Sequence, residues 1–130
     1  MSENLDLVRS IYATIGRGDY SSAEWADPEI EYVVADGPEP GSVTGSDGLV
    51  QAMRTLFSAL DDLRAEAEEY RELDAQRVLV LTRLSGRGKT SGVRIGDRGA
   101  EVFEIHDGNV TRIVSYFDRD RALADLGLQE

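Results

Sequence analysis

The sequence predicts an α+β fold, in which helices dominate the first half of the chain and an antiparallel (mixed) sheet the second. Apolar residues recur at helical spacing up to residue 60, and from residue 63 the period changes to that of strands. Two strand-like runs, residues 102–105 and 110–117, flank Asp107-Gly108, a dipeptide typical of a tight hairpin. The expected order is α-α-β-α-β-β-β-β-α, and the length fits one domain, residues 1–130.

Each helix of the first half is predicted from a polar cap followed by an apolar stripe. Gly16 and Gly18 end the first helix, and its stripe consists of Leu7, Val8, Ile11, Tyr12 and Ile15. A short second helix is expected over residues 20–26. The apolar face of the third consists of Leu49, Val50, Met53, Leu56, Phe57 and Leu60. The expected caps are, in order, Ser2 or Asn4, Asp19, and Ser46 or Asp47.

The first three strands are predicted from short runs that end at turn residues. Residues 30–34 form a short strand, and the Pro- and Gly-rich residues 35–45 after it are expected to form only a loop. Residues 63–73 form a strand with a charged outer face. Residues 78–84 are almost continuously apolar, which predicts a strand that is covered on both faces.

The Gly- and Arg-rich residues 86–99 give the weakest pattern in the chain. They are expected to contain a turn around Lys89-Thr90 and a strand that a bulge at residues 96–99 interrupts. After the two hairpin strands, Asp118 caps a short final helix that Gly127 closes.

The composition excludes several kinds of function. With 14 basic and 25 acidic residues the net charge is −11, which disfavours nucleic acid and membranes as partners. The chain has no cysteine and one histidine, so we expect no disulfide, no metal site and no cofactor. The N-terminus lacks the pattern of a secretory signal, and no apolar run is long enough to span a bilayer. A cytoplasmic protein is therefore expected.

Several motifs, taken in their order, resemble the SnoaL-like branch of the nuclear transport factor 2 superfamily. They are Gly18-Asp19, Asp27-Pro28, and the Asp107-Gly108 hairpin that leads to Tyr116-Phe117-Asp118-Arg119. The resemblance spans essentially the whole chain. It implies a cone-shaped, curved sheet wrapped around the N-terminal helices and a mostly apolar cavity between them. The superfamily includes ketosteroid isomerases, polyketide cyclases, limonene epoxide hydrolases and dehydratases, so the fold implies no single function.

The resemblance to the epoxide hydrolases also suggests which residues face the pocket. Their Arg-x-Asp pair would fall on Arg83-Leu84-Ser85, and their last-strand aspartate would fall on Ser115. Epoxide opening needs a carboxylate to activate water and an acid to protonate the leaving oxygen, so the two serines exclude that activity. Arg83, Ser85 and Ser115 remain expected pocket residues. The convex face is expected to carry Val78, Val80, Leu84, Val102 and Val114.

Arg83 and Glu101 are the candidate catalytic residues. A guanidinium in an apolar strand cannot lose its charge, so Arg83 needs a carboxylate, a ligand anion or water. It would anchor a carboxylate, carbonyl or enolate oxygen of the ligand; otherwise it forms a structural ion pair with Glu101 or lies at the rim. Glu101 shares a strand face with Phe103 and Ile105, so it is either a general base with a raised pKa or an ordinary salt-bridged or exposed carboxylate.

The candidate ligand-binding residues are mostly aromatic. They are Trp25, Tyr32, Phe57, Ser85, Phe103, Ser115 and Phe117. Core packing explains the aromatic residues Trp25, Tyr32 and Phe57 equally well. Asp36 is either a carboxylate at the rim or part of a turn, and His106 is expected at a solvated strand end.

Two hypotheses for the function remain open. In the first, the protein binds a small apolar molecule in an apolar pocket without catalysis. In the second, it is a cofactor-independent isomerase, cyclase or hydro-lyase acting on a small apolar carbonyl compound, with Arg83 stabilising oxygen charge and Glu101 moving the proton. A buried carboxylate without an ion-pair partner would favour the second. A homodimer is also expected, because few helices are left to cover the apolar convex face.

Overall fold

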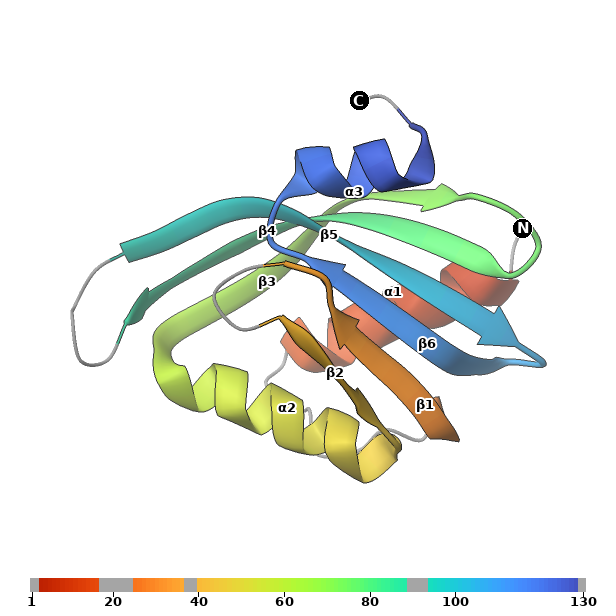
Figure 1. The fold of residues 1–130 in the computed structure, drawn as a ribbon, viewed down its shortest axis with the longest axis horizontal. Helices are drawn as coiled ribbons and strands as arrows, with labels where there is room; N and C mark the ends of the chain where they lie inside the picture. The colour runs from red at the N-terminus through yellow and green to blue at the C-terminus, as the bar shows by residue number, and fades with distance from the viewer. Residues whose placement is uncertain (1–2, 17–24, 37–39, 89–93, 129–130) are drawn as a thin grey trace.

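The computed structural model describes residues 3–16, 25–36, 40–88 and 94–128. Its helices and strands confirm the α+β class (Figure 1). In chain order they are α1 (Glu3–Gly16), β1 (Ala26–Val34), β2 (Gly41–Thr44), α2 (Ser46–Ala59), β3 (Leu60–Glu72), β4 (Arg77–Gly88), β5 (Arg94–His106), β6 (Asn109–Tyr116) and α3 (Arg119–Leu126). Of these described helices, none is both long and apolar enough to cross a membrane.

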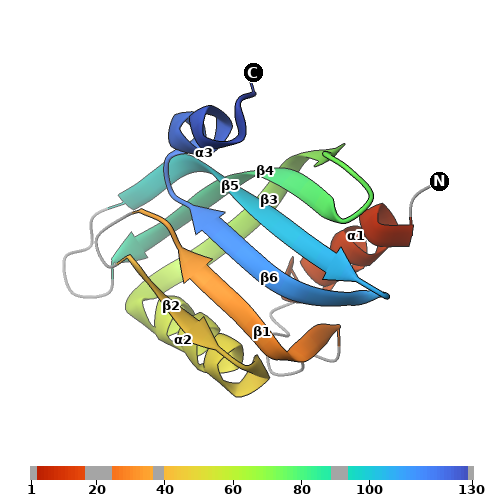
Figure 2. The same ribbon diagram turned by 45° about the vertical axis from the view of Figure 1, so that its right-hand side comes forward.

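The strands form one mixed sheet in the order β2-β1-β6-β5-β4-β3. β1 and β6 are parallel, and the other neighbouring strands are antiparallel. The sheet curves around α1 and α2, while α3 lies on its opposite side (Figure 2). We call the side of α1 and α2 the inner face and the side of α3 the outer face.

An apolar cluster on each face joins the helices to the sheet. On the inner face, Val8 and Ile11 of α1 and Leu49 of α2 are almost fully buried against the strands. On the outer face, Ala122 and Leu123 of α3 are buried in the same way. Burial of these side chains is the main favourable contribution to packing the helices on the sheet.

β4 lies between the two clusters, which explains its continuous apolar sequence. Val78 and Val80 belong to the inner cluster, and Leu79 and Leu81 belong to the outer cluster. Since all four are buried, alternation separates two faces without showing which one is concave. The assignment of Val78 and Val80 to the convex face is therefore wrong, whereas Val102 and Val114 do lie on the outer face.

Three local predictions need correction or lie partly outside the structure. Residues 35–45 do not form only a loop, because they contain β2, which pairs with β1. The short helix over residues 20–26 falls mostly outside the described residues, and Ala26 already belongs to β1. β5 is not interrupted at residues 96–99. Gly99 instead permits a close approach of strands, since a Cβ there would lie 2.5 Å from the backbone oxygen of Tyr116.

The turns of the C-terminal half follow the prediction. Asp107 and Gly108 both have positive φ, 52° and 81°, as a type I′ hairpin requires. Asp118 caps α3 by accepting hydrogen bonds from two backbone N–H groups, and Gly127 ends the helix in the left-handed conformation. The turn expected around Lys89-Thr90 lies outside the described residues.

Candidate functional site

Four polar side chains from four different elements meet on the inner face. Glu101 of β5 and Ser115 of β6 are register partners. Tyr32 of β1 lies two residues from Val34, which pairs with Ser115. Tyr12 reaches them from α1, whose apolar residues pack on the same face. We call Tyr12, Tyr32, Glu101 and Ser115 the inner polar cluster.

Hydrogen bonds join the members of the inner polar cluster into a chain. The Tyr12 hydroxyl donates to Glu101 Oε1. The Ser115 hydroxyl is hydrogen-bonded both to the Glu101 carboxylate and to Tyr32. In both contacts Ser115 lowers the pKa of its partner, as a hydroxyl that donates to the ionised group does. These hydrogen-bonded side chains link β1, β6, β5 and α1.

The surroundings of Glu101 are largely apolar. Its register partner on β4 is Val80, which is fully buried. The ring of Tyr12 packs edge-on against Phe103 and Tyr70, with ring centroids 5.9 and 6.1 Å away. Burial therefore raises the pKa of the Glu101 carboxyl, although the hydrogen bonds from Tyr12 and Ser115 partly oppose the rise.

Both tyrosines of the cluster remain neutral donors at physiological pH. Burial, and then the nearby Glu101 carboxylate, raise the pKa of Tyr32 to about 12. The same causes raise the pKa of Tyr12 well above its ordinary value. Among the groups that the structure describes, no cation pairs with Glu101 or lowers its pKa. The carboxylate thus has hydroxyl partners in place of a counter-ion.

Arg83 does not belong to this cluster. Its side chain is 59% exposed, and its Nε lies 3.5 Å from Oε2 of Glu68. Strand alternation from Val80 places Arg83 on the outer face, three residues further along β4. The expectation that Arg83 faces the pocket beside Glu101 is therefore wrong, and its carboxylate partner is Glu68. Ser85 shares the strand face of Arg83 and is likewise separated from Glu101.

Three of the other candidate ligand-binding residues lie on the inner face. Phe103 is 2% exposed in the inner cluster, and Trp25 and Tyr32 pack against that cluster. Phe117 follows β6 and is half-buried. The side chain of Phe57 lies outside the described part of the chain.

Asp36 makes a long-range contact that neither sequence interpretation anticipated, whereas His106 lies where it was expected. The Asp36 carboxylate accepts hydrogen bonds from the backbone N–H groups of Phe117 and Asp118, at 2.6 and 3.3 Å. Asp36 therefore ties the chain after β1 to the start of α3. His106 is exposed at the end of β5, as expected.

Tyr12 is the residue that sequence reasoning missed as a member of the site. It was assigned only to the apolar stripe of the first helix, where it fits the helical spacing. The available signal was the hydroxyl itself, because a buried tyrosine usually finds a hydrogen-bond partner. Within the described residues, no three His, Cys, Asp or Glu side chains are grouped so that they could hold a metal ion.

Three solved structures show the same fold at low sequence identity. An NTF2-like protein from Burkholderia thailandensis is 22% identical with a TM-score of 0.82, and all of both chains is covered. TerC, co-crystallised with polyporic acid, is 22% identical with a TM-score of 0.78, covering 96% of this chain and 98% of TerC. A ketosteroid isomerase-like protein from Catenulispora acidiphila, in complex with trimethylamine, is 12% identical with a TM-score of 0.72, covering 95% and 93%.

No curated protein matches the chain. The family of SnoaL-like domains matches residues 8–113, which is most of the 130 residues. Together with the curved mixed sheet and its three described helices, this match shows that the chain belongs to the SnoaL-like domain family and has the nuclear transport factor 2-like fold.

Proposed function

We propose that the protein binds a small, largely apolar carbonyl compound on the inner face and that Glu101 moves a proton of that compound. The supporting observation is the Glu101 carboxyl, which has a raised pKa, two hydroxyl partners and no cation beside it among the described groups. A carboxylate that binds its proton more tightly than usual is a better general base near neutral pH. The corresponding reaction class is a cofactor-independent isomerisation, cyclisation or hydro-lyase reaction.

The proposed proton transfer begins at a carbon next to the carbonyl group. The Glu101 carboxylate takes the proton, and the electron pair of the C–H bond forms the double bond of an enolate. Glu101 then returns the proton to another atom of the same molecule, so an isomerisation needs no further reactant. Arg83 lies on the outer face and cannot serve as a donor to the enolate oxygen. Once Glu101 has taken the proton, the Tyr12 hydroxyl no longer faces a carboxylate, so Tyr12 and Tyr32 are the proposed donors to the enolate oxygen.

Binding without catalysis is the second hypothesis, and it needs only the apolar surroundings of the cluster. Trp25 and Tyr32 pack beside the inner apolar cluster and would contact the ligand in either case. The crystals of TerC with polyporic acid and of the Catenulispora acidiphila protein with trimethylamine support a small molecule as the ligand. The two hypotheses differ in whether Glu101 exchanges a proton with that molecule.

Deuterium exchange into a panel of small ketones tests the difference. Glu101→Gln keeps the size and a hydrogen-bonding group but cannot accept the proton, so exchange should fall to the background rate. Glu104→Gln is the matched control, because Glu104 lies on the same strand but pairs with Arg112 on the outer face. Arg83→Ala should also keep the wild-type rate. If no ketone exchanges above background, or if Glu101→Gln is as fast as wild type, the proton-transfer proposal is wrong.

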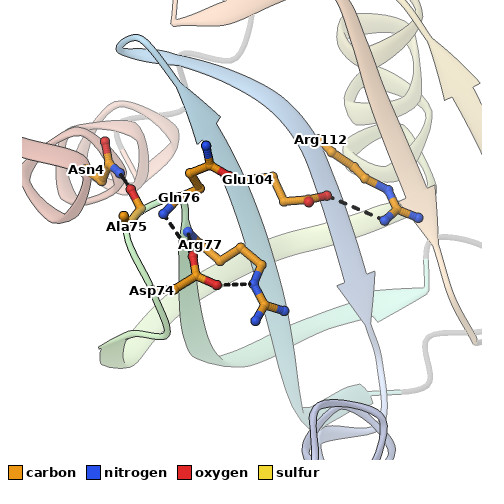
Figure 3. Close-up of polar contacts among 7 residues, drawn as sticks. All are labelled: Asn4, Asp74, Ala75, Gln76, Arg77, Glu104 and Arg112. Atoms are coloured by element: carbon orange, nitrogen blue, oxygen red, sulfur yellow. Dashed lines mark hydrogen bonds and ion pairs between the residues drawn. The ribbon is translucent and has the colours of Figure 1, made fainter.

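We also propose a homodimer formed through the outer face. One row across four strands alternates in charge, because the register aligns Glu31, Arg112, Glu104 and Arg77. Figure 3 shows two pairs of this region, Arg112 with Glu104 and Arg77 with Asp74. A two-fold axis between Arg112 and Glu104 would place every charge of the row opposite its counter-charge in the second copy. Sedimentation at micromolar concentration should then show a dimer, and a purely monomeric species of 14.3 kDa would contradict it.

A further inference from the structure

β1 and β6 form the parallel pair of the sheet, and their pairing brings two members of the inner polar cluster together. Tyr32 lies on β1, and Ser115 lies on β6 as the register partner of Val34. Parallel strands cannot be joined by a tight hairpin, so contacts along the pair have to fix their register. Regular pairing covers only four residue pairs, from Glu31 to Val34 of β1, because a register shift precedes them. A slip by one residue would turn Tyr32 to the other face of the sheet.

The carboxylate of Asp36 lies just beyond the end of this pairing, two residues after Val34. Its Oδ1 accepts a hydrogen bond from the backbone N–H of Phe117, at 2.6 Å, and its Oδ2 accepts one from that of Asp118, at 3.3 Å. The side chain is half-buried, and its two hydrogen bonds cross 81 and 82 positions of the sequence. Both oxygens of Asp36 therefore join the chain after β1 to the chain after β6, beyond the last register pair.

Asp36 is not needed as the cap of α3. Asp118 already caps that helix, because its side chain accepts hydrogen bonds from the backbone N–H groups of Asp120 and Arg121. The N–H groups that Asp36 binds belong to the two residues before α3, which begins at Arg119. The distinct contribution of Asp36 is therefore to tie the end of β6 to the end of β1.

Ser115 lies directly beside this tie and contacts the inner polar cluster from there. Its carbonyl oxygen accepts a hydrogen bond from the backbone N–H of Ala35, the residue before Asp36, at 2.9 Å. Glu101 is its register partner on β5. Its hydroxyl is hydrogen-bonded to Tyr32 and to the Glu101 carboxylate. A shift of the end of β6 would thus move this hydroxyl away from both partners.

We propose that Asp36 is a positioning residue, which fixes the end of β6 against β1 and so keeps the Ser115 hydroxyl at Glu101. Asp36 acts through the backbone of β6, to which its described hydrogen bonds go. Its importance for the reaction rests on the proposed function, in which Glu101 moves a proton. The titration of Glu101 in the protein without ligand tests the positioning alone, whereas exchange into ketones tests the proton transfer, so the two failures are distinguishable.

The direction of the change in the pKa of Glu101 separates positioning from other effects of removing Asp36. The hydrogen bond from Ser115 lowers this pKa, so its loss should raise the pKa. Removal of a negative charge would instead lower the pKa, and so would water that enters a loosened core. Of these three effects, only the displacement of Ser115 predicts a rise.

Carbon NMR of the full chain, labelled at the glutamate carboxyl carbons, follows the titration of Glu101. Asp36→Ala should raise its pKa by about half a unit or more, and Asp36→Asn, which keeps one acceptor oxygen, should raise it by a smaller amount. In the Ser115→Ala background, Asp36→Ala should change the pKa by less than about 0.3 unit, because the hydrogen bond is already absent.

Asp118→Ala is the matched control for charge and for the stability of α3. It removes one carboxylate and the helix cap but keeps the backbone N–H that Asp36 binds, so it should leave the pKa of Glu101 within about 0.3 unit of wild type. Urea unfolding checks that the variants are folded, and Asp36→Asn replaces Asp36→Ala in both backgrounds if the alanine variant is not. The proposal is refuted if the Asp36 variant leaves the pKa unchanged or lowers it, if the rise persists in the Ser115→Ala background, or if Asp118→Ala raises the pKa equally.

Discussion

Removing the hydroxyl of Tyr12 should raise the pKa of Glu101. The substitution Tyr12→Phe keeps the ring that packs against Phe103 and Tyr70 but deletes the donor to Glu101 Oε1. A hydrogen bond to a charged group contributes about 1.5–3 kcal/mol, and one pKa unit corresponds to about 1.4 kcal/mol. The carboxyl of the variant should therefore hold its proton to a pH about one to two units higher than the wild-type carboxyl does.

Carbon NMR of protein labelled at the glutamate carboxyl carbons measures this change directly. The Glu101 signal is identified by its absence in Glu101→Gln, and its titration is followed in wild type and Tyr12→Phe. Tyr70→Phe is the matched control, because Tyr70 contacts the ring of Tyr12 but does not contribute to the pKa of Glu101. An unchanged or lowered pKa in Tyr12→Phe, or an equal rise in Tyr70→Phe, would refute the hydrogen-bonded arrangement of the cluster.

Three further predictions test the site and its support. The raised pKa of Glu101 means that the folded protein holds this proton to higher pH than the unfolded chain, so the free energy of unfolding falls as pH rises between the two pKa values. Urea unfolding across this range should show a smaller fall for Glu101→Gln, and an equal fall would contradict the burial of the charge. Gly99→Ala should cost about 1–3 kcal/mol in urea unfolding, because its Cβ meets the Tyr116 backbone oxygen; Gly41→Ala, with open space around it, is the control and should cost much less. Ser115→Arg should lower the pKa of Glu101 and Ser115→Ala should raise it, as NMR titration would show; shifts in the same direction would be inconsistent with a cross-strand pair.

The sequence predicted the C-terminal half well because its turn residues fix the register. The Asp107-Gly108 turn defines how β5 and β6 pair, and period-two alternation then places Glu101 on the same face as Phe103. The raised pKa of Glu101 was one of the two alternatives that this placement left open, and the structure supports it over a salt bridge. The turn residues of this half act locally, so the sequence alone was sufficient.

The predictions from the sequence failed where a residue's position depends on contacts between distant elements. β4 is apolar on both faces because α1 packs on one and α3 on the other, so alternation could not assign Arg83 to the inner or outer face. The four residues of β2 are all exposed and show no apolar alternation, so nothing distinguished them from a loop. Tyr12 needed a contact across 89 sequence positions to reveal its role. These features depend on tertiary contacts rather than on local pattern.

The pKa of Glu101 on the inner face is raised, whereas the pKa values of Glu68 and Asp74 are lowered. This contrast is the physical basis for placing the chemistry on the inner face. Arg119 lowers the pKa of Glu68 on the outer side, and Arg77 lowers the pKa of Asp74 in the turn between β3 and β4, so both carboxylates stay ionised well below neutral pH and have little affinity for a proton. On the inner side, burial raises the pKa of Glu101, and its hydrogen-bond partners among the described residues are the hydroxyl groups of Tyr12 and Ser115. A carboxylate neutralised by arginine would be a weak base. Of these three carboxylates, Glu101 is therefore the one suited to accept and return a proton near neutral pH.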